Sequence, residues 1–232
     1  MAVLWRIVEG NKGSLQLLPS KKNPRVKRWQ LLEQKKAQPK SKAGRRCKDC
    51  DFRLIPEQMA KRLEQALDEI MPPGEVVDVI APIVSMEIYG APSRTKALMA
   101  AGILQGKRVI FYDHNTFKSE NNLEAQFAYM DLTGLMKKLD LKGLAAHEYG
   151  HLVARKNGGT HRAGLNLANF MTEVLGGLGV FIEAKWELMK EFGDYMKTSD
   201  AEFFAEMYRI HRSGLMPKNL KFVSEYMKNL QQ

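Results

Sequence analysis

Apolar residues recur at intervals of three and four through most of the chain after residue 55, which is the spacing of amphipathic helices. Met59, Leu63 and Leu67 share one such face, so we predict a helix over 56–71 that ends at "MPPG". Two β-branched stretches, "EVVDVIAPIV" and "GKRVIFYDH", instead predict strands. Further helices are predicted over 94–104, 117–139, 139–156, 165–191 with a weak point at "GGLG", 199–213, and a last stretch after "MPKN". The pattern predicts an α+β domain over residues 56–232, with a small sheet packed on several helices.

Residues 1–55 differ from the rest in composition and form a predicted basic N-terminal arm. They hold 15 Lys and Arg against 4 Asp and Glu, a net charge of +11, whereas residues 56–232 carry a net charge of −1. No apolar period runs through the arm, so we expect disorder, or order only on a partner. Lys and Arg bind phosphates without sequence preference, so the expected partner is nucleic acid or another polyanion. The alternative is a solvated tail with no partner.

The composition also limits the cellular setting. No apolar run reaches the roughly 18–20 residues that cross a bilayer, so we expect neither a transmembrane segment nor a membrane partner. The first ten residues, "MAVLWRIVEG", lack the apolar core and the cleavage site of a signal peptide. We therefore expect a protein that is cytoplasmic or associated with a virion.

Two histidines lie four residues apart in "LAAHEYGHLV" (144–153). On a helix such residues lie about 40° apart around the axis, so His147 and His151 can bind one Zn²⁺ ion. Glu148 then reaches a water molecule on the ion and acts as the general base, as in metallopeptidases with the HExxH pattern. The alternative is a core helix whose two histidines form hydrogen bonds with the backbone.

A zinc site needs a third protein donor. Position 157 is Asn, so the pattern with a third histidine six residues after the second is absent, and we expect His161 to lie in a loop. "TSDAEFFAEMYRIHRS" offers Glu202 and Glu206, which lie four residues apart on one helical face. One can bind the metal, and the other can accept a hydrogen bond from a histidine's second ring nitrogen. The alternative is that both glutamates lie on a solvated face.

Together, "HEYGH" and "YMKTSDAEFFAEMYRIHRS" resemble the peptidase domain of anthrax lethal factor and its relatives, a family also found in phage head or virion proteins. The resemblance is strongest in these two blocks and extends over about 75–232. It implies a zincin-like fold of the gluzincin type, with Glu202 as the third zinc ligand. It also implies that Tyr195, seven residues before that ligand, donates a hydrogen bond to the oxyanion; the alternative is a tyrosine packed at a helix end.

The sequence thus predicts a zinc-dependent metalloendopeptidase that hydrolyses a protein or peptide substrate. One alternative is a phage-like virion or head structural or morphogenesis protein, with an arm that contacts nucleic acid and a vestigial or auxiliary metal site. A second alternative is a regulatory protease that cuts a repressor in a mobile element.

Two further stretches carry expectations of their own. We assign "KRVIFY" at 107–112 to an edge strand that pairs with the extended substrate backbone. "CKDC" at Cys47–Cys50 has the spacing of half a zinc knuckle, but no second cysteine pair exists. We therefore expect two free thiols there, with metal binding as the alternative.

Overall fold

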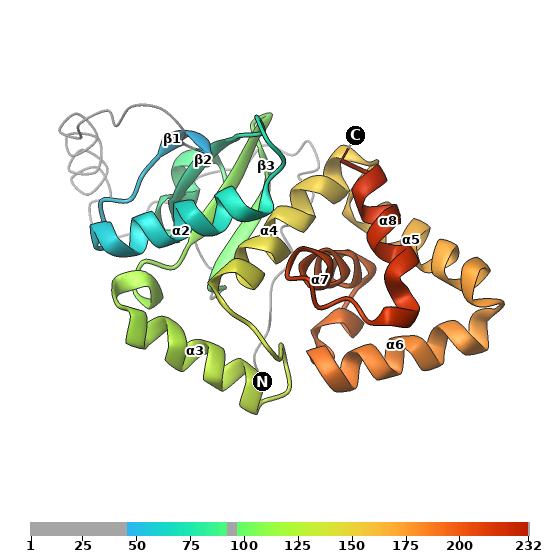
Figure 1. Ribbon diagram of the computed structural model, residues 1–232. Helices are drawn as coiled ribbons and strands as arrows, with labels where there is room; N and C mark the ends of the chain where they lie inside the picture. Colours follow the sequence, from blue (N-terminus) through green and yellow to red (C-terminus); the bar gives the residue numbers. More distant parts are fainter. Residues whose placement is uncertain (1–45, 92–96, 232) are drawn as a thin grey trace, which may run out of the picture. The chain divides into compact units, whose positions relative to one another are not determined.

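The computed structural model describes residues 46–91 and 97–231 (Figure 1). The basic arm up to residue 45 lies outside the described residues, and so does its expected contact with nucleic acid. The strands are β1 (Cys47–Cys50), β2 (Val77–Pro82), β3 (Met99–Leu104) and β4 (Lys107–Tyr112). The α-helices are α2 (Glu57–Ile70), α3 (Glu120–Leu132), α4 (Leu141–Lys156), α5 (Thr160–Leu175), α6 (Leu178–Phe192), α7 (Asp200–Arg212) and α8 (Lys221–Asn229). Short 3₁₀ helices are η1 (Ile83–Tyr89), η2 (Thr116–Lys118), η3 (Asp194–Lys197) and η4 (Lys218–Leu220).

The strands form one mixed sheet in the order β1-β2-β4-β3. β1 and β4 run parallel to β2, and β3 runs antiparallel to β4. The two predicted strands are confirmed as β2 and β4. β1 lies within the range 1–55 that we assigned to the arm, so the sheet begins before residue 56. Its four residues pair in parallel with β2, Cys47 opposite Val77, an arrangement that local sequence periodicity does not reveal.

The helix predicted over 94–104 is wrong, because residues 99–104 form strand β3. β3 and β4 are joined by Gln105 and Gly106, which both have positive φ, at 51° and 75°. Two such residues between antiparallel strands make the turn of a tight hairpin. The pairing with β4 therefore decides the conformation of "MAAGIL", whose small and apolar residues are also compatible with a helix.

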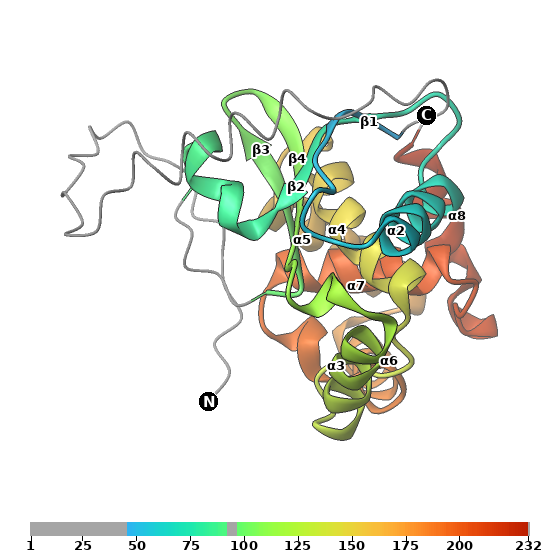
Figure 2. The same cartoon turned by 90° about the vertical axis from the view of Figure 1, so that its left-hand side faces the viewer.

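The sheet separates two apolar clusters (Figure 2). On one face α2 and α4 pack against the strands, and the cluster continues through α5, α7 and α8. On the other face η1 covers residues such as Val79 and Phe111. Side chains along β2 and β4 point alternately to the two faces of the sheet and belong to both clusters, so these strands are buried on both sides. The fold is α+β, as predicted.

Most helix predictions are confirmed. The apolar spacing in 56–71 gives α2, and the two glycines at 176 and 177 divide the predicted 165–191 helix into α5 and α6. Asp140 caps the central helix by accepting a hydrogen bond from the Gly143 N–H, and Ser199 caps α7 in the same way. The predicted helix over 117–139 is shorter than expected, since α3 ends at Leu132.

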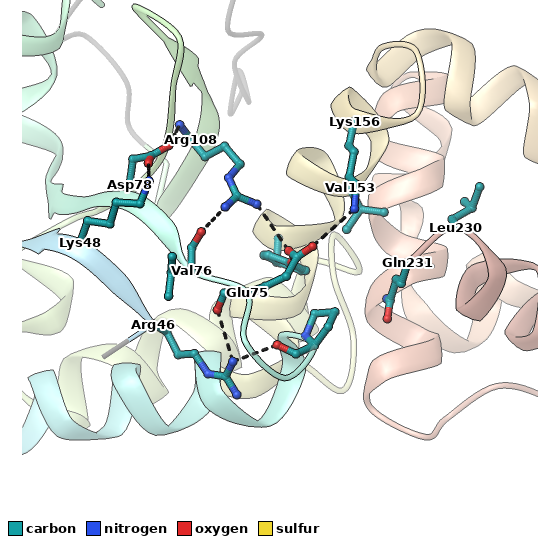
Figure 3. A network of polar contacts seen from close by, with 12 residues as sticks. Arg46, Lys48, Glu75, Val76, Asp78, Arg108, Val153, Lys156, Leu230 and Gln231 are labelled. Atoms are coloured by element: carbon teal, nitrogen blue, oxygen red, sulfur yellow. Dashed lines mark hydrogen bonds and ion pairs between the residues drawn. The ribbon is translucent and has the colours of Figure 1, made fainter. Parts of the chain in front are cut away.

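A charged cluster joins the start of β2 to the sheet-facing side of α4 (Figure 3). The Glu75 carboxylate accepts hydrogen bonds from the Tyr149 hydroxyl, from Arg108 at 3.4 Å and from Lys156 at 3.5 Å. The Arg46 guanidinium donates to the Glu75 carbonyl at 3.3 Å. A cavity of about 250 Å³ lies beside this cluster. The Glu75 carboxylate thus joins Arg108 of β4 to Tyr149 and Lys156 of α4, and the cluster fixes the position of α4 under the sheet.

Cys47 and Cys50 form a disulfide with their Cα atoms 5.8 Å apart. The prediction of two free thiols is therefore wrong. Both cysteines are buried at the edge of the sheet, where the backbone brings residues three apart close enough for the bond. With the sulfurs joined to each other, the pair does not offer a thiolate site for zinc.

Helices α5 and α7 cross closely at Gly164. A Cβ atom at this position would lie 2.0 Å from the Asp200 backbone oxygen. We expect Gly164→Ala to lower the free energy of unfolding by about 3 kcal/mol, the upper end of the usual range for overpacking, because the backbone of Asp200 cannot move aside as a side chain can. Gly179 in α6 is the matched control, since a Cβ there meets nothing within 4 Å. Urea unfolding should show no loss beyond about 1 kcal/mol for Gly179→Ala, and an equal result for both variants would contradict the close crossing.

Candidate metal centre

Helix α4 brings the two motif histidines together. His147 and His151 lie one turn apart, with their ring centroids 4.9 Å apart and their planes nearly perpendicular. His147 is buried, at 2% exposure, and His151 is partly exposed. The Asp140 cap and the buried apolar residues of α4 hold this helix between the sheet and α7. The histidines are therefore presented from a rigid element.

Helix α7 supplies the third side chain. Ser199 caps this helix by accepting a hydrogen bond from the Glu202 N–H at 3.2 Å, which places Glu202 in the first turn. Its Oε2 atom lies 3.1 Å from His147 Nε2 and 3.2 Å from His151 Nε2. The ligand atoms of the three residues all lie within 4.8 Å of one another. The structure thus brings together the three residues that the sequence analysis named as ligands.

Gly150, the fourth residue of "HEYGH", allows α7 to approach α4 this closely. A Cβ atom on Gly150 would lie 3.0 Å from the Tyr208 Cβ and 3.2 Å from the Ala205 Cα. A glycine here removes the side chain that would otherwise separate the helices. Gly150 was not among the residues predicted for the site, although its place inside the "HEYGH" motif is a signal for it.

Glu206 lies behind His147. Its Oε1 atom is 2.7 Å from His147 Nδ1, and its carboxylate is also paired with Arg209 in the same helix. A carboxylate on one ring nitrogen leaves the other nitrogen free to face a metal. Glu206 therefore occupies the position that the sequence analysis described for the second glutamate. Arg209 was missed, although its spacing of three residues from Glu206 on a helix predicts such a pair.

Glu148 is buried beside the cluster and contributes no donor to it. The backbone N–H of Ala101 in β3 donates a hydrogen bond to its carboxylate. Burial raises the pKa of Glu148 above its ordinary value, and the neighbouring His147 and His151 only partly offset this effect. The carboxylate is therefore a stronger base than an exposed glutamate.

Tyr195 lies on η3 with its ring centroid 5.3 Å from that of His147. Burial, and then the negative charge of Glu202, raises the pKa of its hydroxyl far above the ordinary value, so it stays protonated and can donate a hydrogen bond. The backbone fixes this position, since the Tyr195 N–H donates to the Leu135 carbonyl at 2.9 Å. The structure thus places Tyr195 beside His147, and its hydrogen bond to an oxyanion stays a prediction.

Charge in the cluster is arranged around His147. Burial alone would lower its pKa, but hydrogen bonds with Glu202 and Glu206 outweigh burial and raise it to about 10. For Glu202 the reverse holds, because burial would raise its pKa whereas the two histidines lower it well below its ordinary value. Without a metal, the imidazolium of His147 therefore bridges two carboxylates. A cation that binds here takes the place of a proton, so metal binding releases protons.

The donor set fits a divalent metal ion. A tetrahedral ion with bonds of about 2.1 Å holds its ligand atoms roughly 3.4 Å apart. The distances of 3.1 Å and 3.2 Å from Glu202 Oε2 to the two imidazole nitrogens are close to that spacing. The group formed by His147, His151 and Glu202 can therefore hold a metal ion. Two imidazoles and one carboxylate suit zinc among several transition metals.

The other histidines lie away from this group. His161 was expected in a loop, but it lies in the first turn of α5, because α5 begins at Thr160, and its Nδ1 is 2.9 Å from Asp200 Oδ2. His211 lies in the last turn of α7, where burial lowers its pKa to about 4. Neither these two nor His114 belongs to the metal-binding group found among residues 46–91 and 97–231.

Comparisons of the chain with protein-family models, with curated proteins and with solved structures found no match. Among the described residues, no single helix combines the length and the apolar character needed to cross a bilayer. Within the part of the chain that the structure describes, α5 and α6 reach that length and apolar character only as a pair, and the pair is bent by 113° at the break between them.

Proposed function

We propose that the chain is a zinc-dependent metalloendopeptidase of the gluzincin type, with a zincin-like fold. The observation that carries the proposal is the convergence of His147 and His151 from α4 with Glu202 from α7, beside a buried glutamate outside the ligand set. Zinc is proposed because it favours imidazole and carboxylate donors with one position left open. The resemblance of the same two helices to the lethal factor family supports the same assignment.

Each residue of the site then has a role in peptide hydrolysis. His147, His151 and Glu202 would hold the ion, which would supply Lewis acidity and lower the pKa of a water molecule. Glu148 takes the proton from the attacking water and delivers it to the leaving amine. The Tyr195 hydroxyl donates a hydrogen bond to the substrate oxygen as negative charge develops there. Because the pKa of Glu148 is raised, its carboxylate is suited to accept that proton.

The substrate backbone is proposed to pair with β3. This role was predicted for 107–112, but those residues form β4, which has β2 on one side and β3 on the other. β3 (Met99–Leu104) is one of the two edge strands of the described sheet, and its Ala101 N–H contacts Glu148. A peptide that adds to this edge by β-augmentation would lie in extended form next to the general base. The predicted use of 107–112 as the edge strand is therefore wrong.

The proposal is tested with a peptide library and the full-length chain. Purified protein loaded with Zn²⁺ should cleave a subset of peptides, detected by liquid chromatography and mass spectrometry. Incubation with 1,10-phenanthroline should stop cleavage, and added Zn²⁺ should restore it, because the ligands persist without the ion. Cleavage that the chelator leaves unchanged, or metal-loaded protein that cleaves no peptide in the library, would contradict the proposal.

A further inference from the structure

Arg209 is a fully buried cation on α7, with 0% exposure. Its Nε atom lies 3.1 Å and 3.0 Å from the two carboxylate oxygens of Glu206, and its Nη2 atom lies 2.8 Å from Oε2. A buried arginine is unfavourable unless it is paired and its donors are satisfied. The paired geometry therefore has to be maintained for the fold to keep this cation inside.

The Glu206 carboxylate lies between Arg209 and His147. The carboxylate accepts hydrogen bonds from the Arg209 guanidinium with both of its oxygens. It accepts the Nδ1–H of His147 at 2.7 Å, which leaves Nε2 directed at Glu202. The orientation of the His147 ring thus depends on where the Glu206 carboxylate is held.

The other donors of Arg209 face the segments that support Tyr195. Nη1 lies 3.4 Å from the Lys137 carbonyl oxygen, and Nη2 lies 3.5 Å from the Phe192 carbonyl oxygen. These segments also pair with each other, because the Lys137 N–H donates to the Phe192 carbonyl at 2.8 Å. η3, with Tyr195, begins two residues after Phe192. One guanidinium therefore contacts both the support of His147 and the support of Tyr195.

We infer that Arg209 is a positioning residue of the proposed zinc site. Through Glu206 it fixes the ring of His147, and through the carbonyls of Lys137 and Phe192 it fixes the segment that carries Tyr195. The inference rests on the proposed function for the identity of the metal. A lysine cannot replace the arginine in this role, because one ammonium group cannot contact a carboxylate in two places and two carbonyls at once.

The test compares Arg209→Lys with wild-type protein, with Zn²⁺ alone as the probe. We expect the variant to fold and its affinity for Zn²⁺, measured by competition with a chromophoric chelator, to fall by about 10- to 100-fold, the range found for outer partners of metal ligands. The visible spectrum of bound Co²⁺ should also change, because the geometry of the ligands changes.

Arg212→Lys is the matched control, since Arg212 lies on the same helix and donates to the Glu69 carbonyl near the surface. Its affinity for Zn²⁺ should equal that of wild-type protein.

A second variant covers the case in which Arg209→Lys does not fold. In the double variant Arg209→Met with Glu206→Gln, both buried charges are removed, so no unpaired charge is left inside. Thermal melting should show a folded protein, and the affinity for Zn²⁺ should still be at least about 10-fold lower than in wild-type protein. Wild-type affinity in either folded variant would overturn the inference and leave the proposed function standing. A wild-type protein that binds neither Zn²⁺ nor Co²⁺ would overturn both.

Discussion

Glu148→Gln is expected to lower the rate of peptide hydrolysis by at least about 1,000-fold, while the protein keeps its metal ion. General acid–base catalysis typically contributes about 100- to 10,000-fold, and here one carboxylate both takes the proton from water and delivers it to the amine. Glutamine has nearly the same size and can still accept the Ala101 N–H, but it cannot take up the proton. The fold should therefore persist. The measurement is the initial rate on a cleaved library peptide, together with the zinc content by mass spectrometry.

The matched control is Glu124→Gln, an exposed glutamate on α3. Its rate and its zinc content should equal those of wild-type protein. If Glu148→Gln keeps more than about one tenth of the wild-type rate with zinc bound, Glu148 is not the general base. If the variant instead loses its zinc, the side chain acts on the ligands themselves, and the division of roles between Glu148 and Glu202 is wrong.

Glu202→Gln is expected to weaken zinc binding by more than about 100-fold, which exceeds the usual effect of removing an outer partner. The amide is neutral, so the site would consist of two imidazoles and no anionic ligand. Binding by chelator competition measures this loss. Glu187→Gln on α6 is the control, since the Glu187 side chain is 71% exposed and pairs with Lys190 on the same helix. Equal zinc affinity for Glu202→Gln and wild-type protein would remove Glu202 from the ligand set.

The same substitution also affects the metal-free protein. Because the pKa of Glu202 lies well below the ordinary value of 4.5, its ionised form stabilises the fold fully above about pH 4.5. That contribution is lost as the pH falls further. At pH 6, where the raised pKa of His147 keeps the imidazolium charged, metal-free Glu202→Gln should melt below metal-free wild-type protein. The difference in melting temperature should narrow in more acidic buffer.

Part of the candidate site follows from local sequence. Two histidines four apart must share a helical face, and a serine before "DAEFF" caps a helix that then has Glu202 in its first turn. The predictions failed where the conformation depends on distant pairing. Met99–Leu104 is compatible with a helix but pairs with β4, and the pairing of Cys47–Cys50 with β2 extends the sheet into a basic segment.

By itself, the sequence determined the α+β class, the positions of most helices and the pair formed by His147 and His151, because helical periodicity, capping and motif spacing act within a few residues. It left Glu202 and Glu206 open as the third donor, and the choice of Glu202 rested on the resemblance to the lethal factor family. Only the tertiary structure decided that Glu202 meets the histidines, that β3 rather than β4 forms the edge, and that Arg209 stands behind His147 through Glu206. The physical reason is that these contacts depend on packing between segments that are distant in sequence. His147 and Glu202, which are more than 50 residues apart, meet because α4 and α7 cross at Gly150, and the edge position of β3 depends on how the strands pair in the sheet.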